Sequence, residues 1–172
     1  MMYPPSSLRG VTLLIAVILS SVVLTVALAL LDISYKQVIL ASSAKQSHIA
    51  FYSADSAMEC ALYWDQQKNA FSYTASSYVT SSSGFSCADQ NGNEQTIVIS
   101  PPSYSGNASN VSGSTRTTIF SIPCTGGGNQ AKVQVNKQSN GTTDIFATGY
   151  STCSLTDPRR IERGLKIHYD GS

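Results

Sequence analysis

The chain has 172 residues, which is enough for one domain with an appendage. Its 11 Lys and Arg residues nearly balance its 10 Asp and Glu residues, so neither a strongly basic nucleic-acid protein nor an acidic tail is expected. Charged residues make up 12 % of the chain, about half of the roughly 25 % of an ordinary soluble domain. Ser, Thr, Asn and Gly are abundant instead, which is typical of exported surfaces. The two His residues, His48 and His168, have no acidic cluster near them in the sequence, so we expect no enzyme, no metal site and no cofactor.

The most informative segment is an apolar run at residues 11–31, VTLLIAVILSSVVLTVALALL, which has no charge, Pro or Gly. A helix of this length is about 31 Å long, which matches the roughly 30 Å hydrocarbon core of a bilayer. Its few hydroxyl side chains can hydrogen-bond to carbonyl groups of the same helix, so lipid tolerates them. The run predicts a transmembrane helix. Two alternatives stay open: a plain membrane anchor, and a secretory signal cleaved near Ala27-Leu28-Ala29.

A short polar leader, MMYPPSSLRG at residues 1–10, ends in Gly10 directly before this run. The segment Gly10-Val11-Thr12-Leu13-Leu14 resembles the cleavage site of type IV prepilins, and the resemblance extends over roughly residues 5–65. It implies that a prepilin peptidase cleaves between Gly10 and Val11 and methylates the new amino group. It also implies a single-pass protein of the bacterial inner membrane, with its N-terminus in the cytoplasm, that is later drawn into a filament. Arg9 agrees with this orientation.

Two positions depart from the pattern of major pilins. Val11 stands where Phe is usual, and Ile15 stands where Glu is usual. In the family, that Glu pairs inside the filament with the terminal ammonium of a neighbouring subunit. The chain is therefore more similar to PilX-type minor pilins and to pseudopilins that lack the Glu.

The resemblance implies a non-catalytic subunit that acts in the assembly, or at the tip, of a type IV pilus (fimbrium) or a type II secretion pseudopilus. Its implied partners are the prepilin peptidase, other pilins or pseudopilins, the inner-membrane assembly platform and membrane lipid. Two other functions stay open, a secreted cell-adhesion domain and a component of a DNA-uptake pilus.

The helix is expected to continue through residues 32–67, because no Pro or Gly occurs between Val11 and Gly84. Four alanines, Ala50, Ala54, Ala57 and Ala61, recur at 4-3-4 spacing and form one stripe of a helix. A stripe of such small residues lets a sheet or another helix approach closely. The apolar face is widened by three neighbouring residues, Phe51, Met58 and Leu62. The polar residues Ser53, Ser56 and Glu59 are expected on the other side of the helix. The prediction is one helix of roughly 55 residues, about 80 Å long.

Residues 68–172 are expected to form a small β-rich head. Residues 69–83 form a Ser/Thr/Tyr-rich connection, which we interpret as a loop. The strand candidates that follow are residues 95–100, 117–122, 131–136, 144–147 and 161–169. The chain is therefore predicted to be an α+β protein of type IV pilin-like fold, with the helix stripe packed on an antiparallel sheet. The expected core of the sheet is Ile97, Ile99, Val133, Val135, Leu165 and Ile167, packed on Phe51, Ala54, Met58 and Leu62.

Four cysteines occur at positions 60, 87, 124 and 153, and no pair has the CxxC spacing of a zinc or redox site. An even number of Cys in an exported head favours two disulfides, for which three connectivities are possible. We prefer Cys60–Cys87, which ties the helix to the following segment, and Cys124–Cys153, which brackets the last hairpin. Each loop has about 30 residues, so each bridge is expected to contribute roughly 3.6 kcal/mol of stability.

The only basic cluster consists of Arg159, Arg160, Arg163 and Lys166, interrupted by Glu162. Clustered cations can attract phosphate, which would suit DNA capture at the tip of a pilus. On a strand, however, successive side chains alternate between faces, so these charges do not share one face. We therefore do not expect nucleic-acid binding.

Overall fold

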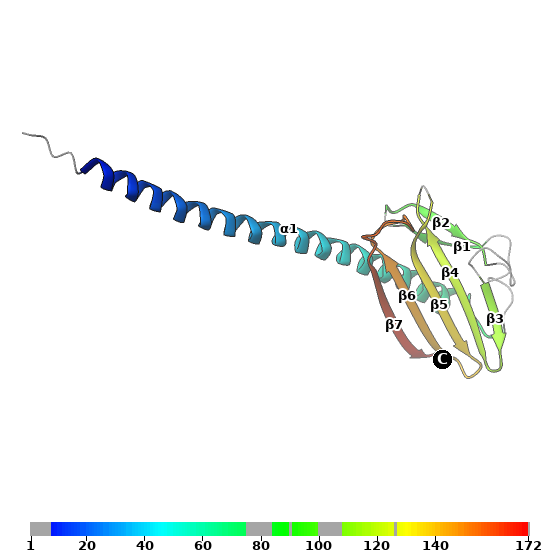
Figure 1. The fold of residues 1–172 in the computed structure, drawn as a ribbon. Coiled ribbons are helices and arrows are strands. Elements are labelled where there is room, and N and C mark those ends of the chain that lie inside the picture. Colours follow the sequence, from blue (N-terminus) through cyan, green and yellow to red (C-terminus); the bar gives the residue numbers. More distant parts are fainter. Residues whose placement is uncertain (1–7, 75–83, 90, 100–107, 126, 172) are drawn as a thin grey trace, which may run out of the picture. The chain divides into compact units, whose positions relative to one another are not determined.

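The structure, a computed structural model, describes residues 8–74, 84–89, 91–99, 108–125 and 127–171. It divides the chain into two compact units, one up to Ala44 and one from Lys45 onwards, and each is described by itself. The described residues form one helix and seven strands (Figure 1). The elements are α1 (Leu8–Lys68), β1 (Phe85–Ala88), β2 (Glu94–Ile97), β3 (Ala108–Ser112), β4 (Thr115–Pro123), β5 (Asn129–Gln138), β6 (Thr142–Tyr150) and β7 (Glu162–Asp170). This α+β composition is the one expected from the sequence.

The first unit contains the apolar part of α1. Its large apolar side chains from Val11 to Leu31 are each between 50 % and 69 % exposed. Ser20, Ser21 and Thr25 donate their hydroxyl hydrogens to carbonyl groups three residues earlier, at 2.8–2.9 Å. Within the described residues, α1 is the one helix that is long and apolar enough to cross a membrane. A secretory signal, or the core helix of a soluble protein, would meet the same criterion.

The end of α1 has a clear local cause. Asn69 adopts a left-handed conformation with φ of 50°, which Asn tolerates better than most residues. The N–H of Asn69 donates to the carbonyl of Asp65, and the N–H of Ala70 donates to the carbonyl of Trp64, both at 3.0 Å. The first of these is the 5→1 hydrogen bond of an αL cap. The chain turns here, and Ala70 and Phe71, which belong to the predicted loop, are buried.

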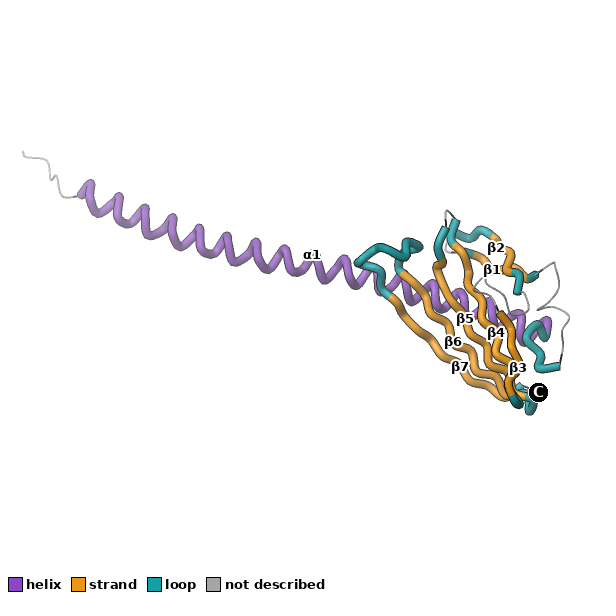
Figure 2. The backbone as a smooth tube through the Cα atoms, turned by 45° about the vertical axis from the view of Figure 1, so that its right-hand side comes forward, coloured by secondary structure: helices purple, strands orange, loops and turns teal. Residues whose placement is uncertain are grey.

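The second unit is built on a five-stranded antiparallel sheet with the order β3-β4-β5-β6-β7, and β1 and β2 form a separate hairpin. Figure 2 shows the last turns of α1 running along one face of the larger sheet. Ala50, Ala54, Ala57 and Ala61 are fully buried. The predicted small-residue stripe is therefore confirmed as the surface that packs on the sheet.

The core of the second unit agrees with the expectation in its centre and differs at its edges. Ile97, Ile99, Val133 and Val135 are buried, as predicted, and so are Ala54 and Met58. Leu62, Leu165 and Ile167 are only half-buried, because β7 is the last strand of the sheet and nothing continues beyond it.

Two residues of the helix were placed wrongly. Phe51 is 43 % exposed, so its assignment to the core was wrong. Ser53 was expected on the polar side but is only 5 % exposed.

An aromatic cluster of Phe71, Phe85 and Phe120, with ring centroids 5.0–5.8 Å apart, fills the region beneath the hairpin. The sequence analysis did not assign it to the core. Such pairs add about 0.5–1.5 kcal/mol each beyond the area that they bury.

Two strands were missed, β1 and β3, and three of the predicted ones, β4, β5 and β6, are longer than predicted. β1 has only four residues, and β3 has the sequence ASNVS, which is rich in residues of low strand propensity. Both are edge or hairpin strands that pair with a single neighbour. The predicted strand at residues 95–100 is β2, Glu94–Ile97; residue 100 lies outside the described residues, as do residues 75–83 of the predicted loop.

Both disulfides have the connectivity preferred from the sequence, Cys60–Cys87 and Cys124–Cys153. The first joins α1 to β1, and the indole N–H of Trp64 reinforces this link by donating to the carbonyl of Ser86 at 2.9 Å. The second joins the end of β4 to the segment between β6 and β7.

Candidate functional site

The predicted processing site lies at the beginning of α1. Gly10 and Val11 are in the first turn of the helix, where the N–H groups have no intrahelical partner. Helix termini fray, so a peptidase has less structure to unwind here than further along α1. No other Gly and no Pro follow in the helix.

The position that the resemblance sets against the Glu of major pilins, Ile15, is apolar. Ile15 is half exposed, and no acidic residue occurs in α1 before Asp32. The Asp32 carboxylate accepts a hydrogen bond from Lys36, one turn along the helix, at 2.8 Å. The first two-fifths of the helix therefore offer no carboxylate to a cation.

The region where α1 meets the sheet contains a close backbone contact at Gly149 of β6. A Cβ atom added to Gly149 would lie 2.1 Å from the carbonyl oxygen of Ala50 and 2.3 Å from the nitrogen of Ala54. Only glycine on β6 and a small-residue stripe on α1 allow the two backbones to approach so closely.

A buried ion pair fixes the C-terminal end of α1. Asp65 is nearly fully buried, and both of its carboxylate oxygens accept hydrogen bonds from Lys137 of β5, at 2.8 and 2.9 Å. The hydroxyl of Tyr169 on β7 donates to the same carboxylate. Burial, and then the hydrogen bond to Asp65, raises the pKa of Tyr169 well above its usual 10.

The sequence analysis missed this network, although a signal was present. Asp65 lies one helical turn beyond Ala61 on the buried stripe, and a carboxylate in such a position needs a cation or several donors.

The predicted basic cluster is divided among separate partners. The guanidinium of Arg160 lies 3.8 Å from the ring centroid of Tyr150, and Nε of Arg163 donates to Ser47 on α1 at 2.7 Å. Lys166 lies 3.3 Å from Asp144 of β6. The side chain of Arg159 is 79 % exposed and has a long contact of 3.9 Å with Asp157. Arg163 and Lys166 contact different layers, the helix and the neighbouring strand, so they do not contribute to one surface.

The two histidines also lie apart. His48 stacks on Tyr52 in α1, and His168 of β7 forms a 3.0 Å hydrogen bond with Asp144. That hydrogen bond lowers the pKa of Asp144, and Lys166 lowers it further against the effect of desolvation. In the ranges that the structure describes, no three His, Cys, Asp or Glu side chains gather as a possible metal site.

The comparisons with known proteins found nothing similar: no protein-family model, no curated protein and no solved structure matches this chain significantly.

Proposed function

We propose that this chain is a minor pilin or pseudopilin, a non-catalytic subunit anchored in a bacterial inner membrane and incorporated into a filament. The observation that carries this proposal is the single uninterrupted helix α1, Leu8–Lys68. It begins at a prepilin-like Gly10-Val11 junction, continues as an apolar membrane-length segment, and ends as part of the hydrophobic core of a disulfide-bonded head.

The exposed apolar surface of residues 11–31 supports a role in lipid and then among other helices. Burial of a Val, Leu or Ile side chain contributes about 1.5–3 kcal/mol. More than a dozen such side chains in this segment are at least half exposed, so the segment requires an apolar environment. The two disulfides support an oxidising compartment for the head.

Ile15 supports a position at the tip or in few copies, rather than as the repeating subunit. A buried ammonium without a partner costs several kcal/mol, and a homopolymer of this chain would bury one at every interface. A single copy at the tip avoids the cost, because its missing carboxylate serves no subunit ahead of it. Expressed as the sole pilin beside an intact assembly motor, the chain should form no filaments, and Ile15→Glu should raise its copy number in filaments of other pilins.

Intact-mass measurement after co-expression with a prepilin peptidase tests the proposal. The expected product lacks residues 1–10 and carries an N-methyl group on Val11. Gly10→Val should block cleavage, because the side chain hinders access to the scissile backbone, whereas the control Ser7→Ala should be processed normally.

An N-terminus near Leu30, after the Ala27-Leu28-Ala29 site, would establish a secretory signal and refute the proposal. An unprocessed chain that stays in the membrane would indicate a plain anchor instead.

A further inference from the structure

The edge of the larger sheet at β7 is open. β7 pairs with β6 over its whole length, and among the described residues no strand pairs with its other side. Both views of the chain show β7 at the outside of the sheet (Figure 1 and Figure 2). Half of the backbone N–H and C=O groups of an edge strand point away from its single neighbour, so this edge can pair with a further strand.

The features that usually block such an edge are absent from the middle of β7. Natural edge strands are protected by Pro, by a β-bulge or by free charged side chains. β7 has no Pro, and its pairing register with β6 has no shift. Lys166 and His168 are both turned back towards β6, where they lie 3.3 and 3.0 Å from the same carboxylate oxygen of Asp144. The backbone in the middle of the edge is therefore left accessible.

One row of α1 side chains runs along β7. Its members are three, four or seven residues apart and so share one face of the helix; they are Ser47, Phe51, Met58, Leu62 and Asp65. Both ends of the row are hydrogen-bonded to β7. Nε of Arg163 donates to Ser47 at 2.7 Å, and the hydroxyl of Tyr169 donates to Asp65. The members between these two contacts therefore lie on the flank of α1 that follows β7.

The apolar side chains between the two contacts stay partly exposed. Phe51 of α1 is 43 % exposed. Leu62 of α1, and Leu165 and Ile167 of β7, are only partly buried. We call these four residues the edge seam. Because removing apolar surface from water is favourable, a partner that covers the edge seam gains free energy.

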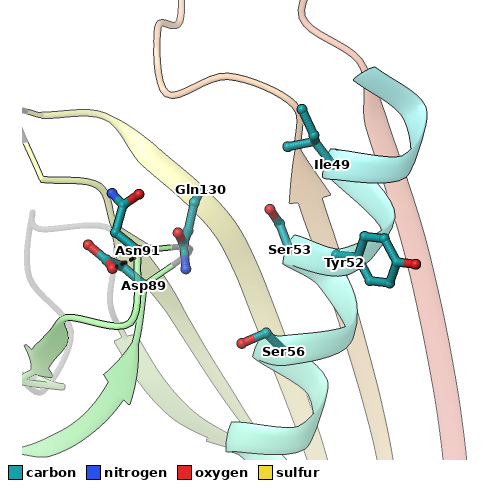
Figure 3. A pocket seen from close by; sticks show the side chains of 7 residues that line it. All are labelled: Ile49, Tyr52, Ser53, Ser56, Asp89, Asn91 and Gln130. Atoms are coloured by element: carbon teal, nitrogen blue, oxygen red, sulfur yellow. Dashed lines mark hydrogen bonds between the residues drawn. The ribbon is translucent and has the colours of Figure 1, made fainter. Parts of the chain in front are cut away.

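The opposite flank of α1 is polar. There Ser53 and Ser56 face Asp89, next to β1, and Gln130 of β5 (Figure 3). The apolar and partly exposed flank is thus the one that lies beside the open strand edge.

A strand added at this edge would lie beside the edge seam. α1 is seated on β6, because the two backbones are in close contact at Gly149. A helix is about 10–12 Å across with its side chains, and neighbouring strands lie about 4.8 Å apart. The flank of α1 therefore reaches the outer side of β7. An added strand would pair its backbone with β7 and place every second side chain against Phe51 and Leu165.

The open backbone and the charges of β7 select the occupant. A docked helix would leave the backbone groups of the edge unpaired, so an extended segment fits better. A second copy of β7 fits poorly. In the full-length antiparallel register it would set Lys166 against Lys166 and Glu162 against Asp170, and like charges opposite each other are destabilising.

The two ends of β7 are acidic. Glu162 and Asp170 are exposed, and within the described part of the chain neither forms an ion pair. An even number of residues separates them, so both side chains lie on the same face of the strand. A partner strand with a cation opposite each end would therefore pair with both.

We propose that the β7 edge binds an extended segment of a different protein chain as an additional strand. Apolar side chains at every second position of that segment cover the edge seam, and a Lys or Arg near each of its ends pairs with Glu162 and Asp170. This site goes beyond the proposed function. It lies wholly in the second unit and does not depend on cleavage at Gly10, so its failure would leave the proposal about the filament unaffected.

Binding is tested with the full chain in phosphocholine nanodiscs and with end-capped peptides of the same length as β7. The probe is Lys-Val-Thr-Ile-Thr-Val-Thr-Val-Lys. One control, Glu-Val-Thr-Ile-Thr-Val-Thr-Val-Glu, keeps the apolar pattern and reverses the end charges, and the other has the sequence of β7 itself. Titration calorimetry measures the affinities, and amide hydrogen exchange locates the bound peptide.

The lysine-ended probe is expected to bind at least about fivefold more tightly than either control. It should slow amide exchange in β7 and leave exchange in β3, the other edge of the same sheet, unchanged.

Two matched pairs of variants locate the binding. Glu162→Lys should weaken the lysine-ended probe about fivefold and strengthen the glutamate-ended one, whereas Glu94→Lys, at an exposed Glu of the separate hairpin, should change neither. Phe51→Ala should weaken the lysine-ended probe about tenfold, whereas Tyr63→Ala, at an exposed aromatic residue of α1 outside the row along β7, should not. The melting temperature of each variant checks that the head stays folded.

Four results would overturn the proposal. The lysine-ended probe does not bind, or it binds without slowing exchange in β7. Glu162→Lys leaves the preference between the two charged probes unchanged, which would show that the ends of β7 do not select the partner. Finally, the peptide with the sequence of β7 binds as tightly as the probe, which would make a second copy of the chain the occupant.

Discussion

The close contact at Gly149 gives a direct test of how α1 is held on the sheet. Gly149→Ala would place a methyl group 2.1 Å from the oxygen of Ala50 and 2.3 Å from the nitrogen of Ala54. These are the two atoms that an α-helical hydrogen bond joins. The clash therefore involves backbone atoms, and shortening a helix side chain, for example by Ala50→Gly, should not relieve it.

The size of the effect follows from these distances. Ordinary van der Waals contact begins near 3.4 Å, so the helix would have to move away from β6 by about 1.3 Å. A gap of about 0.5–1 Å already removes a quarter to a half of a contact's dispersion energy. Overpacking alone costs roughly 1–3 kcal/mol. With the lost dispersion energy added, Gly149→Ala is expected to lower the free energy of unfolding by about 3 kcal/mol or more. That is a large share of the roughly 5–15 kcal/mol that stabilises a domain.

Gly164→Ala on β7 is the matched control. It lies opposite Thr148 in the same sheet, and the nearest atom to its added Cβ is 3.9 Å away. This variant should be neutral, or more stable by up to about 1 kcal/mol, because Ala restricts the unfolded chain.

Urea unfolding of the full chain in nanodiscs, followed by the fluorescence of the single Trp64, measures both free energies of unfolding. Trp64 packs on Phe85 in the core, so its emission reports on the head. If Gly149→Ala unfolds within about 0.5 kcal/mol of Gly164→Ala, the helix is not held by this contact and the reasoning is wrong.

Two further predictions concern the links between α1 and the strands. Above pH 10 the unfolded chain ionises Tyr169 while the folded chain keeps it protonated, so its raised pKa makes stability fall by up to about 1.4 kcal/mol per pH unit. In urea titrations between pH 9 and about 12, Tyr169→Phe should make the free energy of unfolding fall less steeply with pH. If it falls as steeply as in the wild type, Tyr169 is not the group responsible for the decline. Replacement of Cys60 and Cys87 by Ala should lower the free energy of unfolding by about 3.6 kcal/mol, measured by the same fluorescence assay; an unchanged value would show that the bridge does not constrain the unfolded chain.

The sequence predicted the parts of the fold that depend on local periodicity. The alanine stripe could be recognised because an interval of three or four residues defines one helix face. The same periodicity could not tell how far the sheet extends over that face. Phe51 lies beside the stripe, but the sheet ends at β7, so the side chain stays exposed.

The burial of Ser53 depends on contacts that are distant in the sequence. Ser53 was assigned to the polar side of the helix, where a Ser is usual. It is buried at the point where α1 lies directly against β6; a Cβ atom added to Gly149 would lie 2.9 Å from the carbonyl carbon of Ser53. Gly149 is 96 positions further along the chain. Similarly, nothing in the sequence around Gly149 shows that a helix backbone approaches it.

The two parts of α1 place opposite demands on their side chains. Between Val11 and Leu31 the side chains are exposed, so the segment requires apolar character but no particular volume. From Ala50 to Ala61 the stripe residues are fully buried against the sheet, so volume is restricted and even one added methylene group is felt. An Ala→Leu change should therefore be tolerated at Ala27 and disruptive at Ala54. Because α1 is one continuous helix, a shift of the stripe along the sheet would displace Asp65 from Lys137 and Tyr169 as well. The small residues that seat the helix thus also hold the buried ion pair in register.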